Sequence, residues 1–164
     1  MTDIISPKLS SVLPEGRIYL WESFFFVSCA DKQTPLPRRA VDLVEAFLSG
    51  CVTLPWRRTT IQTPLEFTIG EKIVSVHPRP LREDVTIAPS FDLRVDPTHS
   101  LTYANAYLLT GHCQSSGYDY ALGWATWDEV QFVKIHTELR VPARCIPLVD
   151  LHPLQHLEEY LRCL

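Results

Sequence analysis

Thirteen prolines set against only six glycines constrain the fold of this 164-residue chain more than any other feature. Proline has no backbone N–H and breaks the interior of a helix, so its abundance excludes a coiled coil and a mostly helical bundle. Apolar residues make up 46% of the sequence and charged residues 21%, which suits a chain with a buried core and not a disordered one. We expect residues 1–15 to form an N-terminal tail and residues 16–164 to form a single domain.

Two segments have the periodicity of helices. Apolar residues recur at intervals of three and four over residues 38–49, which places them on one face of a helix. Pro37 stands in the first turn, where a helix tolerates proline, and Gly50 is the expected C-terminal cap. A leucine stripe that follows Pro153 predicts a C-terminal helix over about residues 153–163.

Most of the remaining chain has the composition of strands and turns. Gly70 and Glu71 predict the turn of a hairpin, and residues 55–64 are expected to be irregular. Thr126 and Glu129 have the spacing of a capping box, which predicts the start of a short helix. Aromatic and β-branched residues predict strands at 17–29, 65–69, 73–77, 85–88, 91–95, 104–110, 118–124, 132–135 and 143–149. This order predicts an α+β fold, in which a mixed β-sheet is flanked by the helix at about 38–49 and the C-terminal helix at about 153–163.

The charge balance favours a protein partner over a nucleic acid. Fifteen lysines and arginines stand against 19 acidic residues, a formal net charge of −4, whereas strong nucleic-acid binders carry a basic footprint. Nucleic-acid binding through a local patch stays open, because an aromatic ring beside arginines can stack on a base. The candidate residues for that patch are Trp56, Arg57, Arg58, Arg79 and Arg82.

The cysteines and the apolar stretches indicate a compartment. Five widely spaced cysteines include no C-x-x-C pair, which argues against a zinc ribbon and a thioredoxin-like site. Residues 1–13 lack the apolar run of a signal peptide, and the longest apolar stretches are too short to cross a bilayer. We therefore expect a cytoplasmic protein with reduced thiols and no membrane association.

The C-terminal part of the chain carries a family resemblance. A strand ending in YLLTG is followed by the segment Gly123–Glu129 (GWATWDE), and then by an Ile-Pro strand and LHPLQHLEEYL. This series resembles small phage and prokaryotic proteins of the PD-(D/E)XK superfamily, in which a similar Gly-Trp-Ala/Ile-Thr-x-x-Glu segment often follows the last core strands. The resemblance covers about a third of the chain, implies a restriction-endonuclease-like fold, and informs topology more than chemistry.

The same resemblance implies an active site built from carboxylates around Mg²⁺, with a lysine near the attacking water. On that pattern Glu45 is the helix acid and Glu66 the first strand acid. The next strand should carry acid-x-Lys on one face, and it offers Ser75 and His77 instead.

A second register keeps two carboxylates. It takes Asp84 as the first acid and Asp92 with Arg94 as an acid-x-Arg pair, and arginine cannot accept a proton. Because neither register is complete, we predict a degenerate site that binds no metal and uses no cofactor. Mg²⁺ would be needed only if the chain were an active nuclease.

Three functions follow from these observations. The first is a non-catalytic binding protein on a degenerate nuclease-like fold, from a phage or a prokaryote. The second is an active Mg²⁺-dependent nuclease. The third is a self-associating assembly protein, with the apolar run Phe24–Phe26 or the leucine-rich last helix as its interface. The motifs of serine hydrolases (G-x-S-x-G), of P-loops and of dinucleotide-binding proteins are absent from the sequence.

Overall fold

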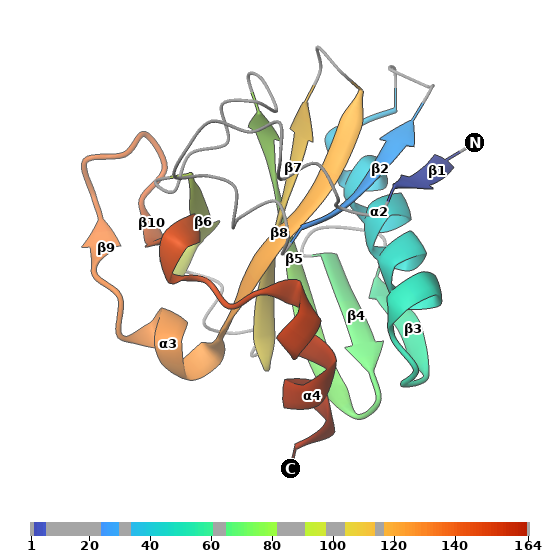
Figure 1. Ribbon diagram of the computed structural model, residues 1–164. Coiled ribbons are helices and arrows are strands. Elements are labelled where there is room, and N and C mark those ends of the chain that lie inside the picture. Colours follow the sequence, from blue (N-terminus) through green and yellow to red (C-terminus); the bar gives the residue numbers. More distant parts are fainter. Residues whose placement is uncertain are drawn as a thin grey trace.

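The computed structural model describes residues 2–5, 24–29, 34–60, 65–81, 91–97, 104–113 and 117–163. Over these residues the chain forms an α+β fold with one mixed sheet of seven strands, a smaller sheet of three strands, and helices on both sides (Figure 1). None of the helices in the described part is both long and apolar enough to span a membrane.

The large sheet has the strand order β1-β2-β8-β7-β5-β4-β3. Its only parallel pair is β5 with β7, and the other neighbouring strands are antiparallel. The bounds of its strands are β1 (Thr2–Ile5), β2 (Phe25–Cys29), β3 (Trp56–Thr60), β4 (Leu65–Ile69), β5 (Lys72–Leu81), β7 (Ala106–Cys113) and β8 (Tyr118–Thr126). The small antiparallel sheet has the order β6-β10-β9, with β6 (Asp92–Val95), β9 (Ile135–His136) and β10 (Ala143–Pro147).

The two faces of the large sheet carry different elements. One face is covered by α2 (Leu36–Cys51) and by the C-terminal η5 (Leu154–His156) and α4 (Leu157–Arg162). The other face is covered by the small sheet together with α3 (Trp127–Gln131) and η4 (Leu148–Asp150) (Figure 1). Each face therefore has a core of its own, which we call the α2-side core and the small-sheet core.

Alternation along the strands explains the two cores. In β4, Leu65, Phe67 and Ile69 are buried in the α2-side core, so the residues between them point to the opposite face. All eight residues of β7 are buried, because both of its faces are covered. Its neighbouring residues Leu108 and Leu109 belong to the α2-side core and the small-sheet core, respectively.

Several expectations from the sequence are confirmed. The helix expected at 38–49 is α2, with a proline in its first turn, and the C-terminal helix consists of η5 and α4. β4 and β5 form the expected hairpin, and Gly70 turns the chain with φ of 61°. The capping box at the start of α3 has both of its hydrogen bonds. The strands expected at 91–95, 104–110 and 118–124 are β6, β7 and β8.

Other expectations are wrong in their boundaries. Gly50 does not cap α2, because the helix continues to Cys51 and Val52 is the cap. Residues 56–60, expected to be irregular, form the edge strand β3, and Thr2–Ile5 of the expected tail form β1. Of the strand expected at 132–135, only Ile135 lies in β9. The strand expected at 85–88 lies outside the described residues.

β5 also extends beyond the strand expected at 73–77 and includes two prolines. Pro78 and Pro80 have no backbone N–H. Because they are two residues apart, both missing hydrogen-bond donors fall on the same edge of β5. The pairing with β4 ends at Val76, whereas the pairing with β7 continues to Leu81. The prolines thus fall where β5 is no longer paired with β4, which is where a sheet accepts proline.

Candidate functional site

The acids of the first nuclease-like register lie on opposite faces of the large sheet. Glu45 is on α2, where its Oε2 lies 3.8 Å from Nη1 of Arg58. Glu66 lies between the buried residues Leu65 and Phe67 of β4, so its side chain points away from α2. The structure therefore does not bring Glu45 together with Glu66 in one cleft.

His77 lies on the same face as Glu66. Its Nε2 is 2.9 Å from Oγ of Ser75, and its ring lies 5.6 Å from the ring of Tyr107. Ser75 is buried and stands opposite Glu66 in the β4–β5 register. The strand positions that the family pattern gives to acid-x-Lys thus hold a hydroxyl and an imidazole that are hydrogen-bonded to each other.

Asp92 of the second register forms ion pairs with two arginines. Arg79 of β5 contacts its carboxylate and donates to its backbone oxygen at 3.1 Å, and Nε of Arg94 lies 3.0 Å from Oδ1. The Arg79 guanidinium also lies 4.9 Å from the centre of the Phe91 ring. Burial lowers the pKa of Arg79, although the Asp92 charge opposes this effect. This cluster links the large sheet to the small one.

Two candidate residues, Asp84 and Arg82, lie outside the described residues. Within the described ranges, no group of three or more His, Cys, Asp and Glu side chains is placed to hold a metal ion.

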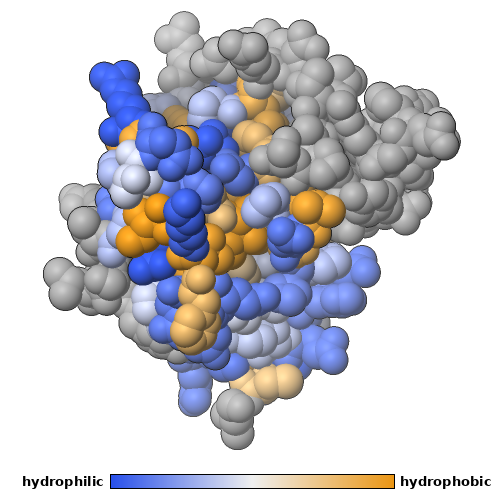
Figure 2. Space-filling model, turned by 90° about the vertical axis from the view of Figure 1, so that its left-hand side faces the viewer, coloured by the Kyte–Doolittle hydropathy of each residue, from blue (hydrophilic) through white to orange (hydrophobic). Residues whose placement is uncertain are grey.

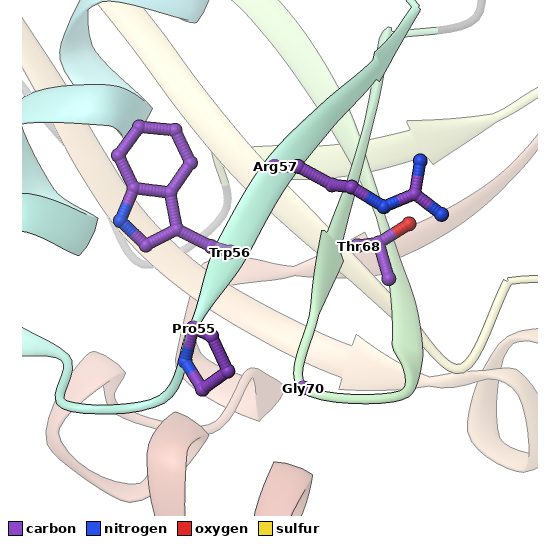
Figure 3. A pocket seen from close by; sticks show the side chains of 5 residues that line it. All are labelled: Pro55, Trp56, Arg57, Thr68 and Gly70. Atoms are coloured by element: carbon purple, nitrogen blue, oxygen red, sulfur yellow. The ribbon is translucent and has the colours of Figure 1, made fainter.

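The candidate nucleic-acid patch is divided between the two sides of β3. Figure 3 shows Trp56 pointing toward α2, while Arg57 points to the other side, near Thr68. Trp56 packs against Phe67 with ring centres 6.1 Å apart, and it belongs to the border of the α2-side core. A cavity of about 180 Å³ lies here, lined by Pro55, Trp56, Arg57, Thr68 and Gly70, and among these residues Arg57 is the cation. The tryptophan therefore does not form a stacking platform together with that arginine.

The apolar segments suggested for self-association contribute to the cores. Phe24 is 2% exposed in the small-sheet core and Phe25 is 6% exposed in the α2-side core. In the C-terminal helix, Leu154, Leu157 and Leu161 are buried against the large sheet. These five described side chains present no open apolar surface.

A different surface is apolar and open, and it lies where α3 meets β10. A pocket of about 310 Å³ is lined there by Ala125, Glu129, Val133, Cys145, Ile146, Pro147 and Asp150. We call it the apolar pocket. Figure 2 looks at the side of the molecule that carries α3, β9 and β10, and it shows hydrophobic surface gathered in a band between hydrophilic regions.

Two large apolar side chains next in sequence to the pocket residues are exposed to solvent. Phe132, beside Val133, is 85% exposed, and Val149, beside Asp150, is 52% exposed. The short helix explains the exposure of Phe132: α3 buries Val130, and a residue two positions further is rotated by about 200° around a helix. We call Phe132, Val149 and the apolar pocket together the α3–β10 surface.

Glu129 of this surface is paired with a neighbouring histidine. His152 Nε2 lies 2.8 Å from both carboxylate oxygens of Glu129. Burial raises the pKa of Glu129, but hydrogen bonds from Thr126 and His152 outweigh it, so the pKa lies below its ordinary value. Burial and the nearby Asp92 raise the pKa of the Cys145 thiol. A protonated thiol is a weak nucleophile, so the pocket is suited to binding more than to thiol chemistry.

A second pocket adjoins the first along β10. It has a volume of about 300 Å³ and is lined by Arg94, Asp96, Leu139, Arg140, Val141, Pro142 and Ala143. We call it the arginine pocket. The two pockets are neighbours because Arg94, in the second, stands opposite Cys145, in the first, in the register of β6 and β10. Val141 adds an apolar side chain that is 66% exposed.

Sequence reasoning missed the residues of the α3–β10 surface. Residues 132–135 were assigned to a strand, which would have given Phe132 a place in a sheet. The capping box at Thr126 was the useful signal, because it fixes the first turn of α3 and therefore the direction of each residue that follows. What the sequence does not reveal is that the helix ends at Gln131, one residue before the phenylalanine.

Comparisons with protein-family models, curated proteins and solved structures gave no match to this chain.

Proposed function

We propose that this protein is a non-catalytic binding protein that docks a protein partner on the α3–β10 surface. Its scaffold resembles a restriction-endonuclease-like domain of phage or prokaryotic origin in which the metal site has degenerated. The observation that carries the proposal is the 85% exposure of Phe132, which is next in sequence to Val133 of the apolar pocket. Exposed aromatic side chains next to a concave apolar site are typical anchors of protein interfaces.

The surface has the parts of an interface. Val133, Ile146 and Pro147 line the apolar pocket, and the carboxylates of Glu129 and Asp150 stand among the same lining residues. An apolar centre with a polar rim is the usual composition of a protein–protein contact. The acidic net charge of −4 also favours a protein over a nucleic acid as the partner.

The arrangement of the acids supports a non-catalytic role. Glu45 pairs with Arg58 on the α2 side, and Glu66 faces the other side of the sheet. Asp92 is neutralised by Arg79 and Arg94. A metal-dependent nuclease needs carboxylates that converge on one or two ions, and these three carboxylates do not converge.

The catalytic alternative is tested by a cleavage assay. The purified protein is incubated with plasmid DNA, single-stranded DNA and RNA in the presence of Mg²⁺ or Mn²⁺. We expect no cleavage above that of Glu66→Ala, prepared identically. Robust cleavage that Glu66→Ala abolishes would show an active nuclease and end this proposal.

Binding is tested with a displayed library of randomised twelve-residue peptides, selected on immobilised protein and on Phe132→Ser. We expect peptides that bind the wild-type protein and lose binding to the variant. Because Phe132 is largely exposed, the substitution leaves the free energy of unfolding within about 0.5 kcal/mol, which urea unfolding checks. Peptides that bind both proteins equally, or a selection that yields no binders, would contradict the proposal.

A further inference from the structure

We infer that the α3–β10 surface recognises a protein segment with a large apolar side chain and, a few residues away, an acidic side chain. This inference rests on the proposed function, since it assigns the chemistry of the partner that docks there. The apolar side chain would enter the apolar pocket and the carboxylate would meet the arginine pocket.

The spacing of the two pockets sets the spacing in the partner. Ala143 lines the arginine pocket, and Pro147, four residues further on the same face of β10, lines the apolar pocket. Four residues of a β-strand span about 13 Å. An extended segment lying along β10 therefore reaches both pockets when its apolar and acidic residues are about three or four positions apart.

The charges around the arginine pocket favour a carboxylate. Asp96 lines this pocket with Arg94 and Arg140, and Asp92 is shared by Arg79 and Arg94, so three arginines stand against two carboxylates and one positive charge is in excess. The contact of Arg94 with Asp92 uses Nε, while the side chain is 40% exposed. Arg140, with an exposed side chain, lines the same pocket. Guanidinium groups bind carboxylates through charge-assisted hydrogen bonds, so this end of the groove selects an acidic residue.

The charges at the other end fix the direction of the segment. Asp150 is exposed and lines the apolar pocket together with Glu129. The charge of Glu129 is balanced by His152, whereas Asp150 forms no ion pair with any other residue that the structure describes. An acidic residue of the partner is disfavoured beside Asp150 and favoured beside Arg140, so the charges define one orientation along β10.

The experiment uses the peptides selected on the full-length protein. We expect enrichment of sequences in which an aromatic or long aliphatic residue is followed or preceded, three to four positions away, by Asp or Glu. One enriched peptide is synthesised, and isothermal titration calorimetry measures its affinity for the wild-type protein and for Arg140→Glu. We expect the affinity to fall at least tenfold, the loss that one charge-assisted hydrogen bond gives.

The matched control is Arg57→Glu, the same charge change at an exposed arginine of the distant strand β3. We expect it to bind the peptide within twofold of the wild-type protein. A peptide in which Lys replaces the acidic residue should bind at least tenfold more weakly to the wild-type protein, and should recover affinity toward Arg140→Glu.

The remaining outcomes separate this inference from the proposed function. Enriched peptides that lack acidic residues, or that bind Arg140→Glu as well as they bind the wild-type protein, would overturn the inference alone, provided that they still require Phe132. Binding that ignores Phe132→Ser would overturn both. Sedimentation showing a wild-type dimer and a Phe132→Ser monomer would identify a second copy as the occupant and overturn the peptide inference.

Discussion

Three ionisable side chains are buried together between α2 and the large sheet. Asp119 of β8 lies 2.7 Å from Nδ1 of His112 and 3.3 Å from Nη1 of Arg39, and all three residues are at most 7% exposed. Burial raises the pKa of Asp119, while the His112 and Arg39 contacts act in the opposite direction. A buried group of this kind is sensitive to the loss of one member, because the remaining charge then has no partner.

We predict that Asp119→Ala lowers the free energy of unfolding by about 3–5 kcal/mol, the cost of leaving a buried charge without its partner. Urea unfolding measures the change. Asp42→Ala is the matched control, since its ion pair with Arg38 lies on the exposed side of α2 and is worth less than about 1 kcal/mol. Equal losses of unfolding free energy in the two variants would show that the buried Asp119 contacts stabilise the fold no more than an exposed ion pair does.

The sequence could not predict ion pairs between residues that are far apart in the chain. Arg39 and Asp119 are 80 positions apart, and only the arrangement of α2 on the sheet brings them together. The same holds for Arg79 and Asp92, which join two different sheets. Local sequence patterns predict the helix in which Arg39 lies and the strands in which Asp92 and Asp119 lie. Which residues form ion pairs is decided by tertiary packing.

The helix α3 is a short element whose start is held by its capping box. Thr126 Oγ1 accepts from the Glu129 backbone at 3.2 Å, and Glu129 Oε1 accepts from the Thr126 backbone at 2.9 Å. We predict that Thr126→Ala lowers the free energy of unfolding by about 1 kcal/mol, the usual value of such a cap. Thermal unfolding measures it, and a loss below about 0.3 kcal/mol would indicate that packing of Val130 alone holds the helix.

The same element gives a dependence on pH. The pKa of Glu129 is lower in the folded protein than its ordinary value, so the ionised carboxylate stabilises the fold above that ordinary value and the gain is lost as the pH falls. Glu129→Gln keeps the hydrogen bond to Thr126 but removes the charge. We predict that it is less stable than the wild-type protein at pH 7 and that the difference begins to close as the pH falls through the ordinary glutamate pKa of about 4.3. A difference that stays constant from pH 7 to pH 3 would contradict this assignment.

Two glycines in different elements give substitutions of opposite sign. A Cβ on Gly123 of β8 would lie 2.9 Å from Cβ of Leu151 and 3.2 Å from the His152 carbonyl oxygen. We predict that Gly123→Ala lowers the free energy of unfolding by about 1–3 kcal/mol, because the segment after η4 must shift away from the sheet.

Gly50 lies in a helical position of α2, and a Cβ built on it has nothing within 4 Å. Gly50→Ala should therefore raise the free energy of unfolding by about 0.5–1 kcal/mol. Chemical denaturation measures both, and two changes of the same sign would contradict this reasoning.

At the scale of elements, the sequence predicted those that have a strong local signal. The period of α2, the turn at Gly70 and the cap at Thr126 each depend on a few neighbouring residues. β3 was missed because its sequence, WRRTT, alternates weakly and sits between prolines. It is a strand because β4 offers a free edge, which is a property of the sheet and not of the segment.

At the scale of the whole molecule, the α+β class followed from the order of elements, but the site did not. The pattern of acids pointed to a shared cleft, and the sheet separates Glu45 from Glu66. The α3–β10 surface depends on how the small sheet packs against α3. The residues of its pocket come from two segments, 125–133 and 145–150, and no sequence motif links one segment to the other.

The two cores share the strands between them, so we predict that they unfold together. Leu108 and Leu109 are consecutive residues of β7 and belong to different cores, which means that neither core survives without that strand. Phe67→Ala in the α2-side core and Leu93→Ala in the small-sheet core remove side chains that are 0% exposed, and each should cost about 2–5 kcal/mol. In both variants, urea unfolding followed by tryptophan fluorescence and by far-ultraviolet circular dichroism should show one coincident transition at a lower midpoint. If Leu93→Ala instead produced an early transition that left the α2-side core intact, the small sheet and its α3–β10 surface would be a separately folding unit, and partner binding would stabilise that unit alone.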